Sequence, residues 1–172
     1  MVSNGGMKIV LGVIDIPYAN NATEKKIPQA KRGKKNQPIK PKVESGTQTT
    51  GDVAQWLENK YGIMDTFAWA QLPDIAKAME ESIAGSLETL IMGGKAGENP
   101  FKSAESEITT MFKKFLETGA IEHMGIEGVP TQAALDGVNH RLKHPNSKEN
   151  PRRESFIDTG AYQQSFKAWV EK

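Results

Sequence analysis

The sequence predicts an α+β fold in which an N-terminal and a C-terminal strand form a small sheet and several helices pack together. Apolar residues alternate near both ends of the chain, in residues 7–18 and 166–171, which is typical of strands. Between them, four segments carry apolar residues at three- and four-residue spacing, as on one face of a helix. A polar, basic segment, residues 20–49, separates the first strand from the helices. We expect one α+β domain over residues 1–172, with residues 20–49 as an extended basic arm.

The first strand is expected over residues 7–18, where Ile9, Leu11 and Val13 share one face. The other face, with Val10 and Ile14, is also apolar, so the sequence predicts that both faces are covered. Pro17 is expected to end this strand.

The basic arm is expected to be a long loop or an extended β-arm, because its three prolines exclude both a helix and a central strand. Residues 24–42 carry one acid and eight basic residues, a charge of +7, so the formal net charge of +1 leaves −6 on the rest of the chain. The eight are Lys25, Lys26, Lys31, Arg32, Lys34, Lys35, Lys40 and Lys42. They are candidates for contact with DNA phosphates or with an acidic neighbouring subunit, and a solvated loop is the alternative.

Four helices are expected between residues 50 and 142. Thr50 or Asp52 can cap the first, which Gly62 ends. Pro73 suits the first turn of the second, and Ser103 is the expected cap of the third. The expected apolar stripes are Ile75, Met79, Ile83, Leu87 and Leu90 in the second helix, Ile108, Met111, Phe112, Phe115 and Leu116 in the third, and Leu135, Val138 and Leu142 in the fourth, which begins at residues 129–131. The first two stripes fit either a core or a subunit interface.

The C-terminal segment is expected to form one helical turn followed by the last strand. Asp158 or Thr159 can cap the turn, which carries Tyr162 and Phe166. In the strand, Trp169 lies on the face opposite Phe166, Ala168 and Val170. We therefore expect Trp169 to be an interface aromatic.

Two motifs could carry chemistry. Residues 156–161, FIDTGA, are similar to the signature of retroviral-type aspartic proteases, but only twelve residues follow Gly160 and the preceding chain is largely helical. We interpret Asp158 as part of a helix cap. His140 and His144 could share a helical face with Asp136 as metal ligands, although Pro145 favours a helix end there. We expect no enzyme, no catalytic residue, no cofactor and no metal site.

Composition excludes other classes of protein. The chain has 172 residues, 37% of them hydrophobic and 25% charged, which is typical of one globular domain. The absence of cysteine excludes disulfides, thiolate catalysis and cysteine-based metal sites. No run of 18 apolar residues and no signal peptide is visible, so we expect no membrane partner.

The order of motifs resembles that of neck and tail-completion proteins, the head–tail joining proteins of long-tailed bacteriophages. The matching pieces are LGVIDIPY, TTGDVAQWLENKYGI, GVPTQAALDGVNHRLK and the segment from Ser155 to Val170. The last is the most specific, because Asp158, Thr159, Gly160 and Ser165 match a helix-opening pattern before the final strand. The segment IMDTFAWAQLPD departs from the proline- and arginine-rich stretch common in such proteins, which leaves the ring position open.

The resemblance implies a structural virion protein, made in the host cytoplasm and located in the neck or tail. It would assemble as a ring of identical copies and act as a tail-completion protein, a tail terminator or a head–tail connector. Its implied partners are copies of itself and other neck and tail proteins, namely the connector, tail tube or sheath, with possible contact to packaged DNA in the channel. The alternative function is a nucleic-acid-binding accessory protein that uses the basic arm.

Overall fold

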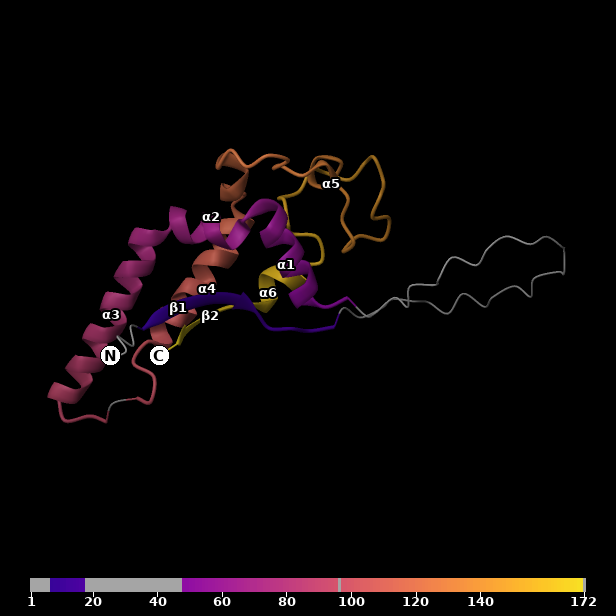
Figure 1. Ribbon diagram of the computed structural model, residues 1–172. Coiled ribbons are helices and arrows are strands. Elements are labelled where there is room, and N and C mark those ends of the chain that lie inside the picture. The colour runs from indigo at the N-terminus through magenta and orange to yellow at the C-terminus, as the bar shows by residue number, and fades with distance from the viewer. Residues whose placement is uncertain (1–6, 18–47, 96, 172) are drawn as a thin grey trace, which may run out of the picture.

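The computed structural model describes residues 7–17, 48–95 and 97–171 (Figure 1). A two-stranded sheet joins the two ends of the chain, and helices form the rest of the structure, so the α+β prediction is confirmed. The elements are β1 (Lys8–Val13), α1 (Thr50–Tyr61), α2 (Ile63–Ala70), α3 (Leu72–Ile91), α4 (Lys102–Glu117), the 3₁₀ helix η1 (Ala120–His123), α5 (Gln132–Leu135), α6 (Ala161–Ser165) and β2 (Phe166–Glu171). None of the helices in these ranges is long and apolar enough to cross a bilayer.

Strands β1 and β2 pair antiparallel, with Lys8 opposite Glu171 and Val13 opposite Phe166. The first strand is therefore shorter than the predicted residues 7–18. Pro17 forms only an isolated bridge with Thr49, because the backbone bends away from β2 after Val13 to meet the start of α1.

Only one face of the sheet packs on the core, so the prediction that both faces of the first strand are covered is wrong. On the inner face, Phe166 and Ala168 of β2 are buried, and Leu11 of β1 is partly buried. Beyond the strand, Ile14 and Ile16 are each 49% exposed. Alternating side chains point to opposite faces of a sheet, and here the helices lie against one of them.

Three fully buried phenylalanines form the centre of the core: Phe67 from α2, Phe112 from α4 and Phe166 from β2. The rings of Phe112 and Phe166 stack with centroids 3.8 Å apart, and Phe67 meets Phe112 edge-on at 5.2 Å. Each buried phenylalanine contributes on the order of 2–3 kcal/mol relative to an exposed one. Segments distant in sequence are thus held together around one aromatic cluster.

The first helix is capped one residue earlier than predicted. The N-cap is Thr49, whose hydroxyl accepts a hydrogen bond from the Asp52 N–H at 3.2 Å, while the Asp52 carboxylate accepts one from the Thr49 N–H at 3.0 Å. This is a capping box. Thr50, predicted as a possible cap, is buried and its hydroxyl donates to the Ile14 carbonyl at 2.6 Å. As predicted, Gly62 ends the helix, with a left-handed φ of 57°.

Helix α2 was not predicted from the sequence. It is only eight residues long and follows α1 directly at Gly62. The carboxylate of Glu58 in α1 accepts hydrogen bonds from the Met64 and Asp65 N–H groups and so satisfies two donors in the first turn of α2. The signal that could have revealed the helix is the four-residue spacing of Ile63 and Phe67, both fully buried.

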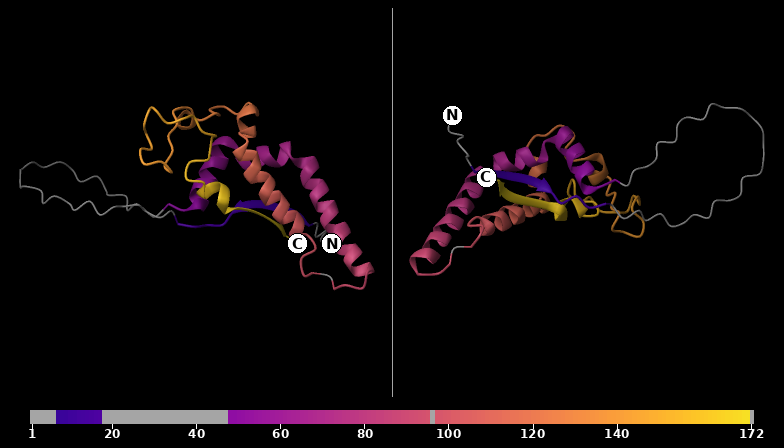
Figure 2. Two further views of the ribbon diagram at one scale, coloured as in Figure 1. Left: turned by 180° about the vertical axis from the view of Figure 1, so that it is seen from behind. Right: turned by 60° about the horizontal axis from the view of Figure 1, so that its bottom comes forward.

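Helices α3 and α4 pack side by side and are joined by the loop between Met92 and Phe101 (Figure 2). Pro73 lies in the first turn of α3, as predicted. The predicted Ser103 cap of α4 is wrong, because the helix starts at Lys102 with Phe101 as its N-cap. The Ser103 hydroxyl instead lies 2.5 Å from that of Ser82, which ties α4 to α3.

The helix predicted to run from residues 129–131 to Leu142 ends at Leu135. Thr131 caps it, and Gly137 adopts a left-handed φ of 69° directly after it. A Cβ atom at Gly137 would lie 2.5 Å from the Asn150 carbonyl oxygen, so the backbone of residues 150–151 occupies the space beside the turn. The chain therefore leaves the helical path, and Val138 and Leu142 do not extend its face.

Candidate interaction surfaces

The second half of α3 carries a stripe of exposed apolar side chains. Ile83, Leu87, Leu90 and Ile91 are 39%, 54%, 47% and 86% exposed. Their spacing of four, three and one residues places them on one side of the helix. The residues that α3 buries all precede this stripe: Ile75, Ala78 and Ser82. The predicted stripe of α3 is thus divided between a buried part and this exposed part, which we call the α3 stripe (Ile83, Leu87, Leu90 and Ile91).

The outer face of the sheet presents one large aromatic side chain, Trp169, among the charged Lys8, Lys167 and Glu171. Trp169 is 36% exposed and lies opposite Val10, while the buried Phe166 and Ala168 lie on the other face. This is the strand face that the sequence predicted for Trp169. The indole lies beside Gly12, where a Cβ would be 2.7 Å from Cη2 of the ring, so a larger residue would displace the indole. The indole N–H donates to the Glu171 carboxylate at 3.0 Å.

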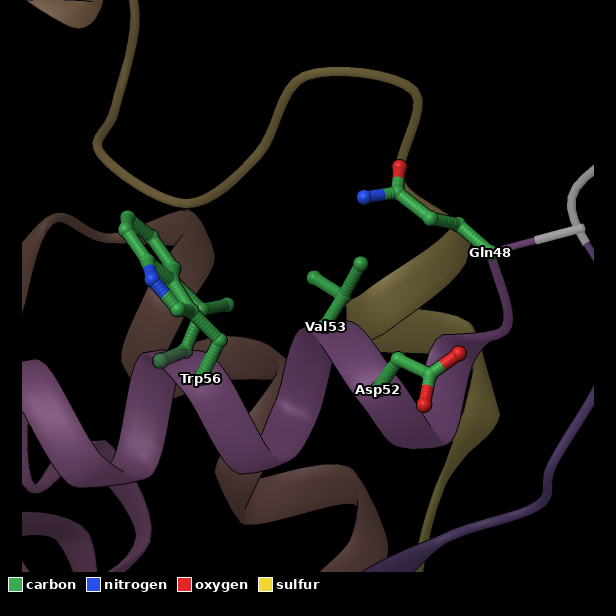
Figure 3. Close-up of a pocket in the computed structure, with 5 residues that line it drawn as sticks. Gln48, Asp52, Val53 and Trp56 are labelled. Atoms are coloured by element: carbon green, nitrogen blue, oxygen red, sulfur yellow. The ribbon is translucent and has the colours of Figure 1, made fainter. Parts of the chain in front are cut away.

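A pocket of about 490 Å³ lies beside α1 (Figure 3). Val53 and Leu57 form its apolar floor, and Trp56, which is 56% exposed, stands at one end. Gln48 and Asp52 lie at the other end. An apolar pocket with a carboxylate and an amide at one end can hold an apolar side chain of a partner together with a basic or amide group.

Asp158 does not cap a helix. The interpretation of Asp158 as part of a helix cap is therefore wrong. Its two carboxylate oxygens are both engaged by His140: Oδ1 accepts from the His140 N–H at 2.7 Å, and Oδ2 lies 2.6 Å from Nδ1. This pair fastens the loop after α5 to the segment before α6. Both oxygens are thus used in a contact with histidine, which differs from the pair of carboxylates sharing a proton in aspartic proteases.

The other members of the same motif have structural positions. Gly160 is the N-cap of α6 with a left-handed φ of 84°, and the Thr159 hydroxyl accepts a hydrogen bond from the Ala161 N–H at 3.3 Å. Ser165 is buried and its hydroxyl donates to the Tyr162 carbonyl at 2.8 Å. Thr159, Gly160 and Ser165 therefore shape the turn that leads into β2.

The histidine pair considered as a metal site is not brought together on a helix. His140 and His144 both follow the end of α5 at Leu135, and His140 contacts Asp158. Asp136 accepts a hydrogen bond from the Gln132 side chain at 2.8 Å. Within residues 7–17, 48–95 and 97–171, no three histidines or acids are grouped so that they could hold a metal ion.

One polar network was not predicted from the sequence. Glu122 Oε1 accepts hydrogen bonds from both the N–H and the hydroxyl of Ser155, at 2.9 and 2.7 Å, and its other oxygen pairs with Arg152. Ser155 is fully buried, and its hydroxyl also accepts from the Thr131 N–H at 3.0 Å. Burial acts to raise the pKa of Glu122, but the hydrogen bonds from Ser155 and the Arg152 charge outweigh it and hold that pKa below its ordinary value.

The eight basic candidates from Lys25 to Lys42 lie outside the described residues, as does most of the predicted arm. Pro17, before residues 18–47, and Thr49, after them, form the isolated bridge, and Thr49 is also the N-cap of α1. The chain therefore leaves the described fold before residue 18 and re-enters it after residue 47 at the same place.

Comparisons with known proteins give no similarity on which to draw: no protein-family model, no curated protein and no solved structure matches this chain. The chemistry of its surfaces is therefore the basis for a function. What they offer is apolar contact area on α3, the partly exposed Trp169 on the sheet, and a pocket beside α1.

Proposed function

We propose that this protein is a structural component of a long-tailed bacteriophage virion, located in the neck or tail, where copies of it form a ring that helps to join head and tail. Its activity is geometric, not catalytic. Each copy presents one face to a neighbour, and the ring presents its two sides to the connector and to the tail tube or sheath.

The observation that carries this proposal is the α3 stripe. A water-soluble monomer seldom exposes a row of large aliphatic side chains along one helix, because such a patch is stabilised by burial against a partner. The stripe lies on a helix at the periphery of the molecule (Figure 2). A surface of this kind that fits a different surface of the next copy is a heterologous contact, and heterologous contacts close into rings when their rotation allows it.

The order of the motifs along the chain supports the same proposal. The first strand, the first helix, the segment after Gly128 and the segment from Ser155 to Val170 follow one another as in neck and tail-completion proteins. The proposal covers three ring positions, those of a tail-completion protein, a tail terminator and a head–tail connector.

The α3 stripe provides the test. Leu87→Glu combined with Leu90→Glu places two charges in the contact, so the wild type should form closed rings and the variant should not. Lys77→Ala is the matched control, because Lys77 lies on the same helix with a side chain that is 71% exposed. Light scattering coupled to size exclusion gives the mass, and negative-stain electron microscopy shows whether a ring is closed. A wild type that stays monomeric at all concentrations would contradict the proposal.

A second candidate function rests on the charge of residues 24–42. Their +7 charge fits contact with DNA phosphates, and the protein would then be a nucleic-acid-binding accessory protein. In that case DNA affinity should fall steeply with salt, by a slope of about −0.9 in log–log form for each phosphate neutralised. Deletion of residues 24–42 should abolish this affinity. If the deletion variant instead binds DNA normally but fails to assemble, the basic arm contacts a neighbouring subunit.

A further inference from the structure

The two outer edges of the sheet differ in how their main-chain groups are bonded. On β2, the outward N–H of Ala168 donates to the Thr109 hydroxyl at 3.3 Å, and that of Val170 donates to the Glu105 carboxylate at 2.9 Å. Both acceptors are side chains of α4. Helix α4 therefore occupies the β2 edge, and this edge cannot accept another strand.

Strand β1 has no such cover in the described structure. The ladder to β2 uses the main-chain groups of residues 8, 10 and 12, since Leu11 and Ile9 lie opposite the outward-facing Ala168 and Val170. The N–H and C=O groups of Ile9, Leu11 and Val13 consequently point away from β2. Among the described residues, none forms a hydrogen bond with these outward groups. The bonds that tie α1 to this segment reach only residues 14–16.

Apart from Lys8 at its start, β1 also lacks the features that keep an edge strand from pairing. Proteins usually protect such an edge with a lysine, a proline or a bulge. From Ile9 to Val13 the sequence is IVLGV, without a charge or a proline, and its pairing with β2 is regular. The inner side chains of Ile9, Leu11 and Val13 remain partly exposed, whereas Phe166 and Ala168 opposite them are buried. The β1 side of the sheet is thus incompletely covered both at its edge and beneath it.

We infer that β1 pairs antiparallel with β1 of a second copy of this chain, which makes a continuous four-stranded sheet with the order β2–β1–β1–β2. The occupant is a second copy because the edge is complementary to itself. A two-fold axis at Leu11 places Leu11 opposite its own counterpart and Ile9 opposite Val13, so every outward N–H and C=O of these residues finds a partner. The β2 edge cannot be the partner strand, since α4 occupies it.

This inference goes beyond the proposed function and does not rest on it. A two-fold contact through β1 is distinct from the rotational contacts that close a ring, and it uses a different surface from the α3 stripe. Glutamates in the α3 stripe should leave the contact through β1 intact. Substitutions that prevent β1 from pairing should leave the contact through the α3 stripe intact.

Single cysteines test the pairing directly, because the chain has none of its own. With the axis at Leu11, Val10 and its counterpart are diagonal neighbours about 7–8 Å apart on the outer face. A Val10→Cys variant should therefore form a covalent dimer with a short bis-maleimide. Lys167→Cys is the matched control on the same face of β2, where three strand spacings separate the two copies by about 14 Å. Equal cross-linking of both variants, or of neither, would overturn the inference.

Amide exchange and mass supply a measurement that does not depend on the cysteines. The Leu11 amide should exchange more slowly as protein concentration rises, and in the Leu87→Glu/Leu90→Glu background the mass should shift from one to two chains over the same range. Leu11→Pro removes an N–H that β2 does not use, and Ile9→Lys adds a charge at the edge without changing the backbone. In the Leu87→Glu/Leu90→Glu background, where the α3 stripe is blocked, either variant, once shown by circular dichroism to be folded, should have the mass of one chain. A folded edge variant that dimerises as well as the wild type would also overturn the inference.

Discussion

The outer edge of the Trp169 indole in β2 contacts Gly12 of β1, so that these two residues form one contact across the outer face of the sheet. A methyl group at position 12 would lie 2.7 Å from Cη2 and 3.0 Å from Cζ3 of the ring. The ring is partly exposed and can rotate outward, so the conflict is resolved by moving the indole and not the strands.

The first prediction concerns this contact. Gly12→Ala should displace the indole, lower the free energy of unfolding by about 1 kcal/mol and shift the tryptophan emission to longer wavelength. In a Trp169→Ala background the same substitution should cost nothing, because the obstructing ring is absent. Denaturant unfolding of the four proteins of this double-mutant cycle measures the difference. An equal cost in both backgrounds would mean that Gly12 is needed for another reason.

The second prediction separates the two threonines before α1. Thr49→Ala removes the N-cap and should cost about 1 kcal/mol. Thr50→Val should cost more, up to about 3 kcal/mol, because the Thr50 hydroxyl bonds both the Ile14 carbonyl and the Ile16 N–H. Thr110, whose exposed hydroxyl bonds only within α4, is the control site. A smaller loss at Thr50 than at Thr49 would contradict the assignment of the cap.

The third prediction is acid sensitivity through Glu122. The folded pKa of Glu122 lies below its ordinary value of 4.5, so its charge stabilises the fold above that pH. This contribution should be lost as pH falls below 4.5 through the lowered folded pKa. Glu122→Gln should therefore narrow the difference in melting temperature between pH 7 and pH 3. Glu127→Gln, at an exposed position, should leave that difference as in the wild type.

The fourth prediction concerns the contact between Asp158 and His140. Asp158→Ala should release the loop after α5 and leave α6 intact, because Asp158 holds His140 and does not cap the helix. Limited proteolysis should then cut residues 140–150 faster, with little change in helical circular dichroism. Asp158→Asn should also leave any peptidase background unchanged. A specific peptidase activity abolished by that substitution would reverse the interpretation of this motif.

The fifth prediction is that the Tyr162 hydroxyl is dispensable for stability. The side chain is buried, and within the described structure its hydroxyl forms no hydrogen bond. Burial raises the pKa of this hydroxyl, with the nearby Glu58 charge acting in the same direction. Tyr162→Phe should therefore keep or raise the melting temperature, since it removes an unpaired polar atom from the interior. Ser165→Ala, which breaks a buried hydrogen bond, should lower it.

Local patterns in the sequence were sufficient to predict the two strands and most of the helices. Alternation of apolar residues predicts both strands, and Pro73 and Gly62 mark helix ends that the structure has. The N-caps of α1 and α4 lie one and two residues before the predicted Thr50 and Ser103. For α1 the reason is that the sequence alone does not distinguish Thr49 from Thr50. Only the fold distinguishes a threonine that caps α1 from one that bonds β1.

Contacts between distant segments could not be predicted. Glu122 and Ser155 are 33 positions apart, and nothing in the neighbourhood of either residue indicates that they meet. The end of α5 likewise depends on the backbone of residues 150–151 beside Gly137. The α3 stripe is apolar in the sequence, but whether it faces the core depends on where α4 begins beside α3, at Ser103 next to Ser82.

The sheet that joins the two ends of the chain also determines when the protein can fold during its synthesis. The paired residues lie 153 to 163 positions apart, since Val13 pairs with Phe166 and Lys8 with Glu171. Phe166 fills the centre of the aromatic cluster, so that cluster stays open until the ribosome has released the segment containing β2. Closing so long a loop is slow. Until β2 pairs with β1, the helices therefore remain in a partly collapsed state with apolar surface exposed. Truncation before Phe166 should thus yield a chain that depends on chaperones.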